Sequence, residues 1–435
     1  MKTKKKTERI GIVSLGCAKN LVDTEVLMRQ LDENSFQLIT DPSGAETLDA
    51  AVINTCGFIL DAKNESIDTI LDFVKMKKEG RLKKLFVIGC LSERYKNELA
   101  NEIPEVDGFF GVNELPVILQ SLGSQYRKEL LGERHLTTPG HYAYLKIAEG
   151  CDRKCSFCSI PSIRGSHVSR PMEDILHEAE FLAKKGVREI NVISQDTTFY
   201  GQDLYQKRLL PELLQNLSCI KGIEWIRLHY TYPDGFSPEL MKVMRENDKI
   251  CKYVDIPLQH ISARILKSMK RGVGSRKTWN LIASIRKNIP GVAIRSALIT
   301  GYPGETHQEH LELCDFVRKA RFDRLGVFTY SHEEGTTAYQ LKDSVSGSLK
   351  KKRASELMDI QQEISLELNQ KKIGEKQKVI IDRKENEFYI GRTQYDSPEI
   401  DDEVLIRTAK TLSIGSFYDV KITAAENFDL YGEIH

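Results

Sequence analysis

Short apolar runs alternate with amphipathic stretches along the first third of the chain. The runs at residues 9–15, 50–54 and 84–88 have the length and composition of buried strands. Between them, leucine, isoleucine and methionine recur at intervals of three and four residues, which predicts helices over residues 21–31 and 67–74. Strands that alternate with helices predict a parallel sheet, and all strands of such a sheet end at the same edge.

The alternation continues through the middle of the chain, after the polar stretch His135–His141. A helix is predicted from Pro171, with acidic residues in its first turn and Gly186 just past its end. Six strand and helix units predict an incomplete barrel, whose binding residues are expected at the C-terminal ends of the strands. The predicted strands are 142–147, 190–194, 225–230, 253–258, 293–300 and 324–330.

The pattern changes in the last quarter of the chain. Ser346–Lys372 is a predicted amphipathic helix, and we interpret its basic run Lys350–Arg353 (KKKR) as a solvated face. Short β segments then follow at 379–382, 387–393, 403–407 and 417–424 and predict a small all-β barrel. The predicted fold class is therefore α/β, with a parallel-sheet N-terminal domain, a central open (βα)6 partial barrel and a small terminal β barrel. The predicted domains are 1–134, 135–373 and 374–435.

Composition narrows the class of protein. The chain has 435 residues, of which 40% are hydrophobic and 29% are charged, so we expect a globular protein of more than one domain. Its 63 Lys+Arg and 62 Asp+Glu give no overall signal for nucleic acid. No apolar run has the length of a membrane span, and the basic start lacks the apolar segment of a signal peptide. We therefore expect a cytoplasmic protein whose nine cysteines are thiols or metal ligands.

Three cysteines stand within eight residues, at Cys151, Cys155 and Cys158, with no fourth soft ligand beside them. A structural zinc site needs four ligands in a closed tetrahedron. Three thiolates on one loop instead suit a cuboidal iron–sulfur cluster, with one iron left open to bind another molecule. A fragment of a zinc site and a chance grouping are the alternative interpretations.

A second set of cysteines shares one position in the predicted sheet, because Cys17, Cys56 and Cys90 each follow a predicted strand. Parallel strands end at one edge, so the three thiols are expected to converge although 39 and 34 residues separate them. They are candidate ligands of a second open cluster. The alternative is three buried core thiols, which is the commonest fate of a free cysteine. The remaining cysteines are interpreted as core residues: Cys219, Cys251 and Cys314.

The CxxxCxxC spacing, with Phe157 before its last cysteine, resembles the cluster loop of the radical S-adenosylmethionine (SAM) superfamily. The resemblance implies that SAM binds the open iron of a 4Fe–4S cluster and is cleaved to an adenosyl radical. Residues at the ends of the barrel strands are then candidates for contact with SAM, although capping a helix or lining the rim is an equally good interpretation of each. With Phe157, these candidates are Gln195, Gln259, Gly301 and Glu305.

Three motifs in the first domain are similar to the cysteine motifs of the methylthiotransferase family: SLGCAKNLVDTE, NTCG and IGCL, which start at Ser14, Asn54 and Ile88. The terminal module is similar to the TRAM module of that family. SLGCAKN, HYAYLKIAEGC, SQDTTFYG and IPLQHIS resemble the RimO branch, with Ala18 where proline is more usual. That branch modifies an aspartate of the small-subunit ribosomal protein numbered twelve.

The resemblance implies a sulfur-inserting enzyme with two 4Fe–4S clusters, held by the six cysteines as catalytic residues and metal ligands, and with two uses of SAM. It also implies an external electron donor such as a flavodoxin or ferredoxin, and we expect a monomer. Residues 375–435 hold 8 Lys+Arg against 13 Asp+Glu, a net charge of −5, which favours a basic protein substrate over RNA. Asp401, Asp402 and Glu403 are expected at that docking surface. The alternatives are a tRNA adenosine methylthiotransferase and a zinc-stabilised adaptor protein.

Overall fold

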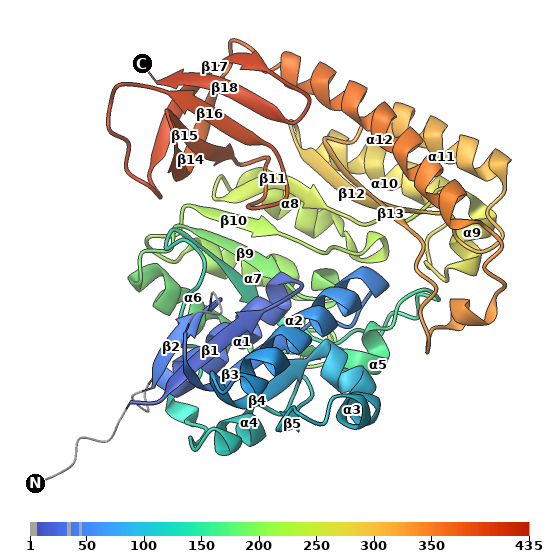
Figure 1. The fold of residues 1–435 in the computed structure, drawn as a ribbon. Coiled ribbons are helices and arrows are strands. Elements are labelled where there is room, and N and C mark those ends of the chain that lie inside the picture. Colours follow the sequence, from blue (N-terminus) through green and yellow to red (C-terminus); the bar gives the residue numbers. More distant parts are fainter. Residues whose placement is uncertain (1–6, 33–35, 43–45, 435) are drawn as a thin grey trace, which may run out of the picture. The chain divides into compact units, whose positions relative to one another are not determined.

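A computed structural model describes residues 7–32, 36–42 and 46–434 of the chain (Figure 1). The described chain divides into two compact units. The first unit runs up to Thr137 and also includes Glu149–Asp152 and Ser159–His167. The second unit comprises Thr138–Ala148, Arg153–Cys158 and Val168–His435. No helix among the described residues is long and apolar enough to span a membrane.

The first unit is built on a five-stranded parallel sheet with the strand order β2-β1-β3-β4-β5 (Figure 1). The strands are β1 (Arg9–Ser14), β2 (Gln37–Thr40), β3 (Leu48–Thr55), β4 (Leu82–Gly89) and β5 (Gly108–Phe109). The helices are α1 (Ala18–Asp32), α2 (Leu60–Lys78), α3 (Cys90–Glu102), α4 (Leu115–Ser121) and the short α5 (Ile160–Arg164). The predicted parallel sheet is confirmed, and the pattern missed the edge strands β2 and β5.

Both faces of this sheet are covered by helices, which makes the unit a three-layer structure. On one face Ile70, Phe73 and Val74 of α2 pack with Leu91 and Leu99 of α3. On the other face α1 and α4 supply the buried side chains, which are Leu27, Met28, Leu31, Ile118 and Leu119. Strands covered on both faces are apolar in their buried part, which explains the continuous hydrophobic runs in the middle of β1, β3 and β4.

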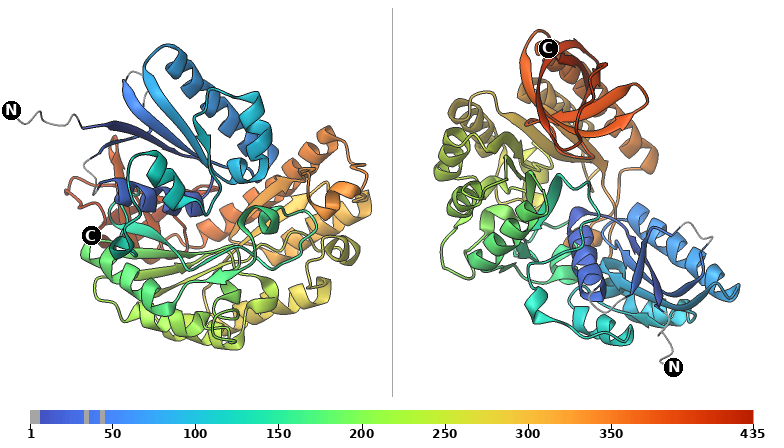
Figure 2. Two further views of the ribbon diagram at one scale, coloured as in Figure 1. Left: turned by 90° about the horizontal axis from the view of Figure 1, so that it is seen from below. Right: turned by 90° about the vertical axis from the view of Figure 1, so that its left-hand side faces the viewer.

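The second unit contains a six-stranded parallel sheet with the order β13-β12-β11-β10-β9-β6. Its strands are β6 (Tyr142–Lys146), β9 (Glu189–Ile193), β10 (Trp225–Leu228), β11 (Ile250–Asp255), β12 (Ala293–Thr300) and β13 (Arg324–Thr329). The helices between them lie along the outer face of the sheet (Figure 2): α6 (Met172–Lys184), α7 (Leu210–Ser218), α8 (Pro238–Glu246), α9 (Ala263–Ser268), α10 (Ser275–Asn288) and α11 (His307–Ala320). The strands are consecutive and β6 and β13 stay unpaired with each other, so the predicted open partial barrel is confirmed.

The end of the chain forms a closed five-stranded barrel with the order β14-β15-β16-β18-β17. Its strands are β14 (Lys376–Glu385), β15 (Phe388–Thr393), β16 (Glu403–Arg407), β17 (Phe417–Ala425) and β18 (Asp429–Ile434). The sequence predicted four of these strands and missed β18, which closes the barrel by pairing with both β16 and β17. Helix α12 (Gly347–Gln370) precedes the barrel and packs against α11 and β13 (Figure 1).

The basic run at the start of α12 is only partly the solvated face that we predicted. Lys351 and Lys352 are exposed, whereas Lys350 and Arg353 are buried. Residues 350 and 353 lie one turn apart on the same side of the helix, so both side chains turn inward together. Lys350 Nζ donates to the Tyr330 carbonyl oxygen, and Arg353 Nη1 donates to Glu305 Oε1 at 2.8 Å.

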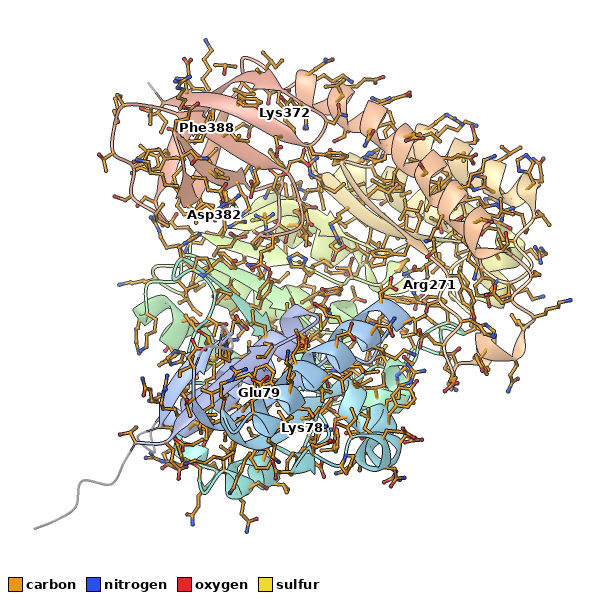
Figure 3. The ribbon with its side chains drawn as sticks, in the orientation of Figure 1. Lys78, Glu79, Arg271, Lys372, Asp382 and Phe388 are labelled. Atoms are coloured by element: carbon orange, nitrogen blue, oxygen red, sulfur yellow. The ribbon has the colours of Figure 1, made fainter. Side chains whose placement is uncertain are left out.

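The terminal barrel is fixed to the six-stranded sheet by buried charged groups. Glu189, at the start of β9, accepts hydrogen bonds from Arg227 of β10 and from Arg392 of the barrel, each at 2.8 Å. Arg392 also pairs with Asp382, whose second partner is His141 at 2.7 Å. Figure 3 labels Asp382. These groups are almost fully buried, so the barrel and the sheet form one continuous structure.

Two of the three acidic residues expected at a docking surface, Asp401 and Asp402, are used inside this contact, so the prediction was wrong for them, whereas Glu403 pairs with Arg383 of the same barrel and stays partly exposed. Asp401 accepts a hydrogen bond from Tyr253 and pairs with Arg295. Asp402 is buried and lies 3.1 Å from Arg324. Charge composition cannot distinguish an acid that faces solvent from one that faces an arginine elsewhere in the same chain.

Candidate functional site

The three N-terminal cysteines follow adjacent strands of the first unit: Cys17 follows β1, Cys56 follows β3, and Cys90 is the first residue of α3 after β4. Their turns are in direct contact. A Cβ atom on Gly16 would lie 2.7 Å from Cys56 Cβ, and one on Gly57 would lie within 2.8 Å of the backbone of Cys90. Only glycine permits so close an approach, and Gly16 also has a φ of +92°. The structure therefore brings the three turns together at one sheet edge.

Asparagine side chains hold these turns in register. Asn20 Nδ2 donates to the carbonyl oxygens of Leu15 at 2.9 Å and Thr55 at 3.1 Å. Asn54 Nδ2 donates to the carbonyl oxygen of Asn20 at 2.9 Å, and its Oδ1 fills the space beside Gly89 where a Cβ would collide. Both asparagines belong to the motifs around Cys17 and Cys56, so the motifs encode the framework as well as the thiols.

The three thiols differ in exposure. Cys17 is exposed, Cys56 is half-buried and Cys90 is buried. Burial raises the pKa of Cys90 to about 11, and the nearby Arg164 guanidinium opposes that rise. Burial also raises the pKa of Cys56. Metal ions bind thiolates, so loading this site must release protons.

Arg164 also contacts the group of three N-terminal cysteines, and the sequence did not predict it. It is the last residue of α5, and its Nε donates to Cys90 Sγ at 3.3 Å. The same guanidinium contacts Asn20, Asp23 and Glu149. No local pattern marks this arginine, because its partner Cys90 lies 74 residues earlier in the chain.

The loop with Cys151, Cys155 and Cys158 lies in the sequence between the short strand β7 (Ala148–Glu149) and α5, and β8 (Val168–Ser169) follows α5. In the first unit, the Cys151 amide donates to the Gly165 carbonyl oxygen at 3.0 Å. Gly150 is required there, because a Cβ on it would lie 2.0 Å from the Ser166 carbonyl oxygen.

In the second unit, the later half of the loop is anchored by packing and by hydrogen bonds. Phe157 packs against an apolar group that includes Ile265, Met269 and Tyr302. Ser156 Oγ lies 2.9 Å from the Tyr302 hydroxyl oxygen. The aromatic residue before the last cysteine therefore fixes the loop, and Cys155 and Cys158 stay partly exposed beside it.

Arg271, labelled in Figure 3, contacts the part of the cysteine loop that belongs to the second unit. Its Nη1 donates to Cys155 Sγ at 3.4 Å, and its guanidinium lies 4.3 Å from the ring centre of Tyr232. Arg153 lies 3.9 Å from the same ring and pairs with Asp196 at 2.8 Å. Burial and the Cys155 sulfur raise the pKa of Tyr232 to about 12, although both arginines act in the opposite direction.

The candidate SAM residues lie past the C-terminal ends of the barrel strands. Gln195 follows β9 and is half-buried. Gln259 follows β11 and has a left-handed backbone conformation with a φ of +74°. Its amide donates to the Ala297 carbonyl oxygen at 2.8 Å, and its carbonyl oxygen accepts from Ile299 at 2.7 Å. A non-glycine residue in this conformation is held there by its surroundings and is typical of functional sites.

The loop after β12 is organised by the Glu305 carboxylate. Its Oε2 accepts from the Gly301 amide at 2.6 Å, and its Oε1 pairs with Arg353. Gly301 adjoins the Lys350 side chain, whose Cγ would lie 2.3 Å from a Cβ. The carboxylate is therefore engaged within the protein, and the need for glycine at 301 is explained by Lys350 without a bound ligand.

The two cysteine groups each supply three soft sulfur donors. Across residues 7–32, 36–42 and 46–434, no three His, Cys, Asp or Glu side chains are arranged to hold one metal ion. A four-iron cluster binds each cysteine through a different iron, so its ligands need not converge on one point. Two of the other cysteines, Cys251 and Cys314, are core residues as predicted, but Cys219 is exposed and that interpretation was wrong.

Family models match three successive parts of the chain. The model described as "Radical SAM superfamily" matches residues 145–317, "TRAM domain" matches 373–434, and "Uncharacterized protein family UPF0004" matches 9–111. Solved structures resemble this fold. TsrM of Kitasatospora setae, a radical S-adenosylmethionine methyltransferase, aligns with a TM-score of 0.57 at 13% identity, over 81% of this chain and 89% of its own. The chain is a radical SAM enzyme.

Curated relatives match the chain over its full length. "Ribosomal protein uS12 methylthiotransferase RimO" of Bacteroides thetaiotaomicron is 56% identical over 99% of both chains. The protein of the same name from Christiangramia forsetii is 55% identical over 100% of this chain and 96% of its own. The chain therefore belongs to the RimO family of methylthiotransferases.

Proposed function

We propose that this protein inserts a methylthio group at the β-carbon of an aspartate in the small-subunit ribosomal protein uS12. The observation that carries the proposal is the pair of three-cysteine sets, one on the N-terminal sheet edge and one on the loop before α5. The substrate is taken from the full-length relatives, which are named for it. The β-carbon has an unactivated C–H bond, which no side-chain base can deprotonate at neutral pH.

We further propose two 4Fe–4S clusters, one held by Cys151, Cys155 and Cys158 and the other by Cys17, Cys56 and Cys90. When bound, these groups and two molecules of SAM supply the radical, the sulfur and the methyl group. The protein's own task is to place the reactants and to exclude water. The half-buried Phe157 anchors the loop that carries Cys151, Cys155 and Cys158. Asn20 and Asn54 keep the three N-terminal cysteine turns in register.

For SAM itself, we propose contacts with Phe157, Gln195, Gln259 and the loop Gly301–Glu305. The strained backbone of Gln259 supports this assignment, because it presents the residue at the ligand-binding end of the barrel. Glu305 contributes by positioning the loop, since its carboxylate is already bound to Gly301 and Arg353.

The same proposal covers the organisation and partners of the chain. We propose a methylthiotransferase domain at 1–134, a radical SAM domain at 135–373 and a TRAM domain at 374–435, acting as a monomer with an external one-electron donor such as a flavodoxin or ferredoxin. None of the nine cysteines, all of which are among the described residues, forms a disulfide, and this suits the reducing cytoplasm that we propose. The acidic composition of the terminal barrel no longer supports the substrate assignment, because Asp382, Asp396 and Asp402 pair with arginines of the same chain.

The test compares two triple variants of the full chain, prepared and reconstituted without oxygen. C151A/C155A/C158A should lose reductive SAM cleavage and keep about four iron atoms, whereas C17A/C56A/C90A should keep SAM cleavage and lose sulfur insertion. The control is C219A, which removes an exposed cysteine outside both sets. Loss of all iron from either triple variant, with its circular dichroism unchanged, would contradict two separate clusters. Modification of tRNA and not of uS12 would contradict the substrate.

A further inference from the structure

Arg164, the last residue of α5, donates a side-chain hydrogen bond to one of the N-terminal cysteines. Its side chain is almost completely buried, with 2% exposed, and Nε donates to Cys90 Sγ at 3.3 Å. It lies outside the cysteine motifs of the sequence. Arg164 therefore places a permanent positive charge next to Cys90, which is a proposed cluster ligand.

The guanidinium is held rigidly by three other side chains of the same unit. Nη2 donates to Asn20 Oδ1 at 2.5 Å, and Nη1 donates to Asp23 at 3.2 Å and to Glu149 at 2.9 Å. An arginine presents its donors in a fixed planar fork, so these contacts also fix the direction of Nε. The N–H bond toward the Cys90 sulfur is therefore built into the fold.

A hydrogen bond from a cation to a ligand sulfur favours the reduced form of a cluster. Reduction adds negative charge, and hydrogen bonds to the sulfurs together with local charge set the reduction potential. Asp23 and Glu149 act in the opposite direction, but they lie behind the guanidinium and face its Nη1 atom. A carbon radical brings one electron to a new C–S bond and a closed-shell sulfur brings two, so one electron is left over. An iron–sulfur cluster that held the sulfur would accept this electron. A raised potential makes that step more favourable.

We propose that Arg164 is a positioning residue that raises the reduction potential of an iron–sulfur cluster held by Cys17, Cys56 and Cys90. This inference rests on the proposed function, because it requires a cluster at these cysteines. It goes further by assigning the electron affinity of that cluster to one side chain. Removing the cation would also leave Asp23 and Glu149 without their shared partner, so both effects lower the potential.

The experiment uses the full-length C151A/C155A/C158A background, reconstituted without oxygen so that iron binds only at the N-terminal set. The midpoint potential of this cluster is then measured by a redox titration followed by electron paramagnetic resonance. Arg164→Met should shift the one-electron equilibrium at least tenfold toward the oxidised form, which corresponds to about 59 mV. Arg164→Lys keeps the charge and should shift it less. Asp23→Asn removes a negative charge and should shift it in the opposite direction.

The matched control is Arg134→Met. Arg134 is a buried arginine of the same unit that pairs with Glu25 at 3.0 Å, so its loss tests the effect of destabilisation without removing a bond to sulfur. Unchanged potential in Arg164→Met, or an equal shift in Arg134→Met, overturns the inference. If Arg164→Met does not fold, the signs of the Arg164→Lys and Asp23→Asn shifts decide. A background protein that binds no iron refutes the proposed second cluster and the inference with it, whereas an unshifted, fully loaded Arg164→Met refutes the inference alone.

Discussion

Replacing Arg392 with methionine should loosen the terminal barrel from the six-stranded sheet. Arg392 is 2% exposed and contacts Glu189, Asp382 and the Asp396 carbonyl oxygen at once. Methionine keeps much of the volume and removes the charge. Two buried carboxylates would then each lose a partner, although Arg227 still pairs with Glu189.

The size of the effect follows from burial. Removing one partner of a buried ion pair costs about 3–5 kcal/mol, because the remaining charge stays buried without compensation. We expect the lower part of this range for Arg392→Met, since each carboxylate keeps one neighbour, namely Arg227 or His141. Arg383 is the matched control. It lies on the same barrel and pairs with Glu403 at 2.5 Å, but 42% of its side chain is exposed, so Arg383→Met should cost no more than about 1 kcal/mol.

Tryptophan fluorescence offers a local assay. The chain has two tryptophans, and Trp225 packs against Phe417 of the barrel with 4.7 Å between ring centres. In a Trp279→Phe background, urea unfolding followed by fluorescence therefore reports on this contact, with all variants compared at equal iron content. A midpoint that moves equally for Arg392→Met and Arg383→Met would refute the reasoning, because it would mean that burial does not set the cost of losing these charges.

Two further predictions concern groups buried in the same unit. Burial and the charge of Asp396 raise the pKa of Asp402 to about 7. Between about pH 4 and 7 the folded protein therefore holds a proton that the unfolded chain has released, so the stability of the fold should fall as pH rises through this range. Thermal unfolding of Asp402→Asn, measured across the same range, should depend less on pH. Arg353→Met should weaken SAM binding about tenfold in anaerobic calorimetry, because Arg353 holds Glu305, and Glu305 holds the loop at Gly301. The control, Lys351→Met on the exposed side of α12, should leave SAM binding unchanged. A pH profile of Asp402→Asn that matches the parent, or equal SAM affinities for the two α12 variants, would contradict these predictions.

The elements that the sequence predicted are those with a strong local pattern. The central runs of β3 and β4 are apolar because helices cover both faces of the sheet, so they could be recognised without any tertiary information. The edge strand β2 has four half-exposed or exposed residues, and β5 has two residues in all, so neither carries a periodic signal. Strand β18 forms a hairpin with β17 and pairs in parallel with the more distant β16, but its sequence DLYGEI has only three apolar residues and no strong local pattern.

The cysteines of the candidate sites were predictable for the same reason, since each follows a recognisable strand or stands in a compact motif. Arg164 was not predictable, because the segment around it is typical of a short helix that ends at glycine. By contrast, the inward direction of Arg353 could have been found. It lies four residues before Leu357 and seven before Ile360, on the buried stripe of the helix, so helical periodicity already contradicted a fully solvated basic run.

The contact between the terminal barrel and the sheet also determines what a truncation experiment can show. The terminal barrel contacts the six-stranded sheet near the starts of its strands, at Glu189 of β9 and Arg324 of β13. The candidate SAM residues lie at the opposite ends of these strands, as Gln195 does after β9. A chain that ended before the barrel would expose the Glu189 and Arg227 ion pair to solvent and would leave Arg324 without Asp396. Such a chain would lose stability in the sheet that carries the SAM site, so a loss of activity could not be assigned to substrate recognition. Substitutions on the exposed face of the barrel separate the two effects, because they leave the buried charges in place.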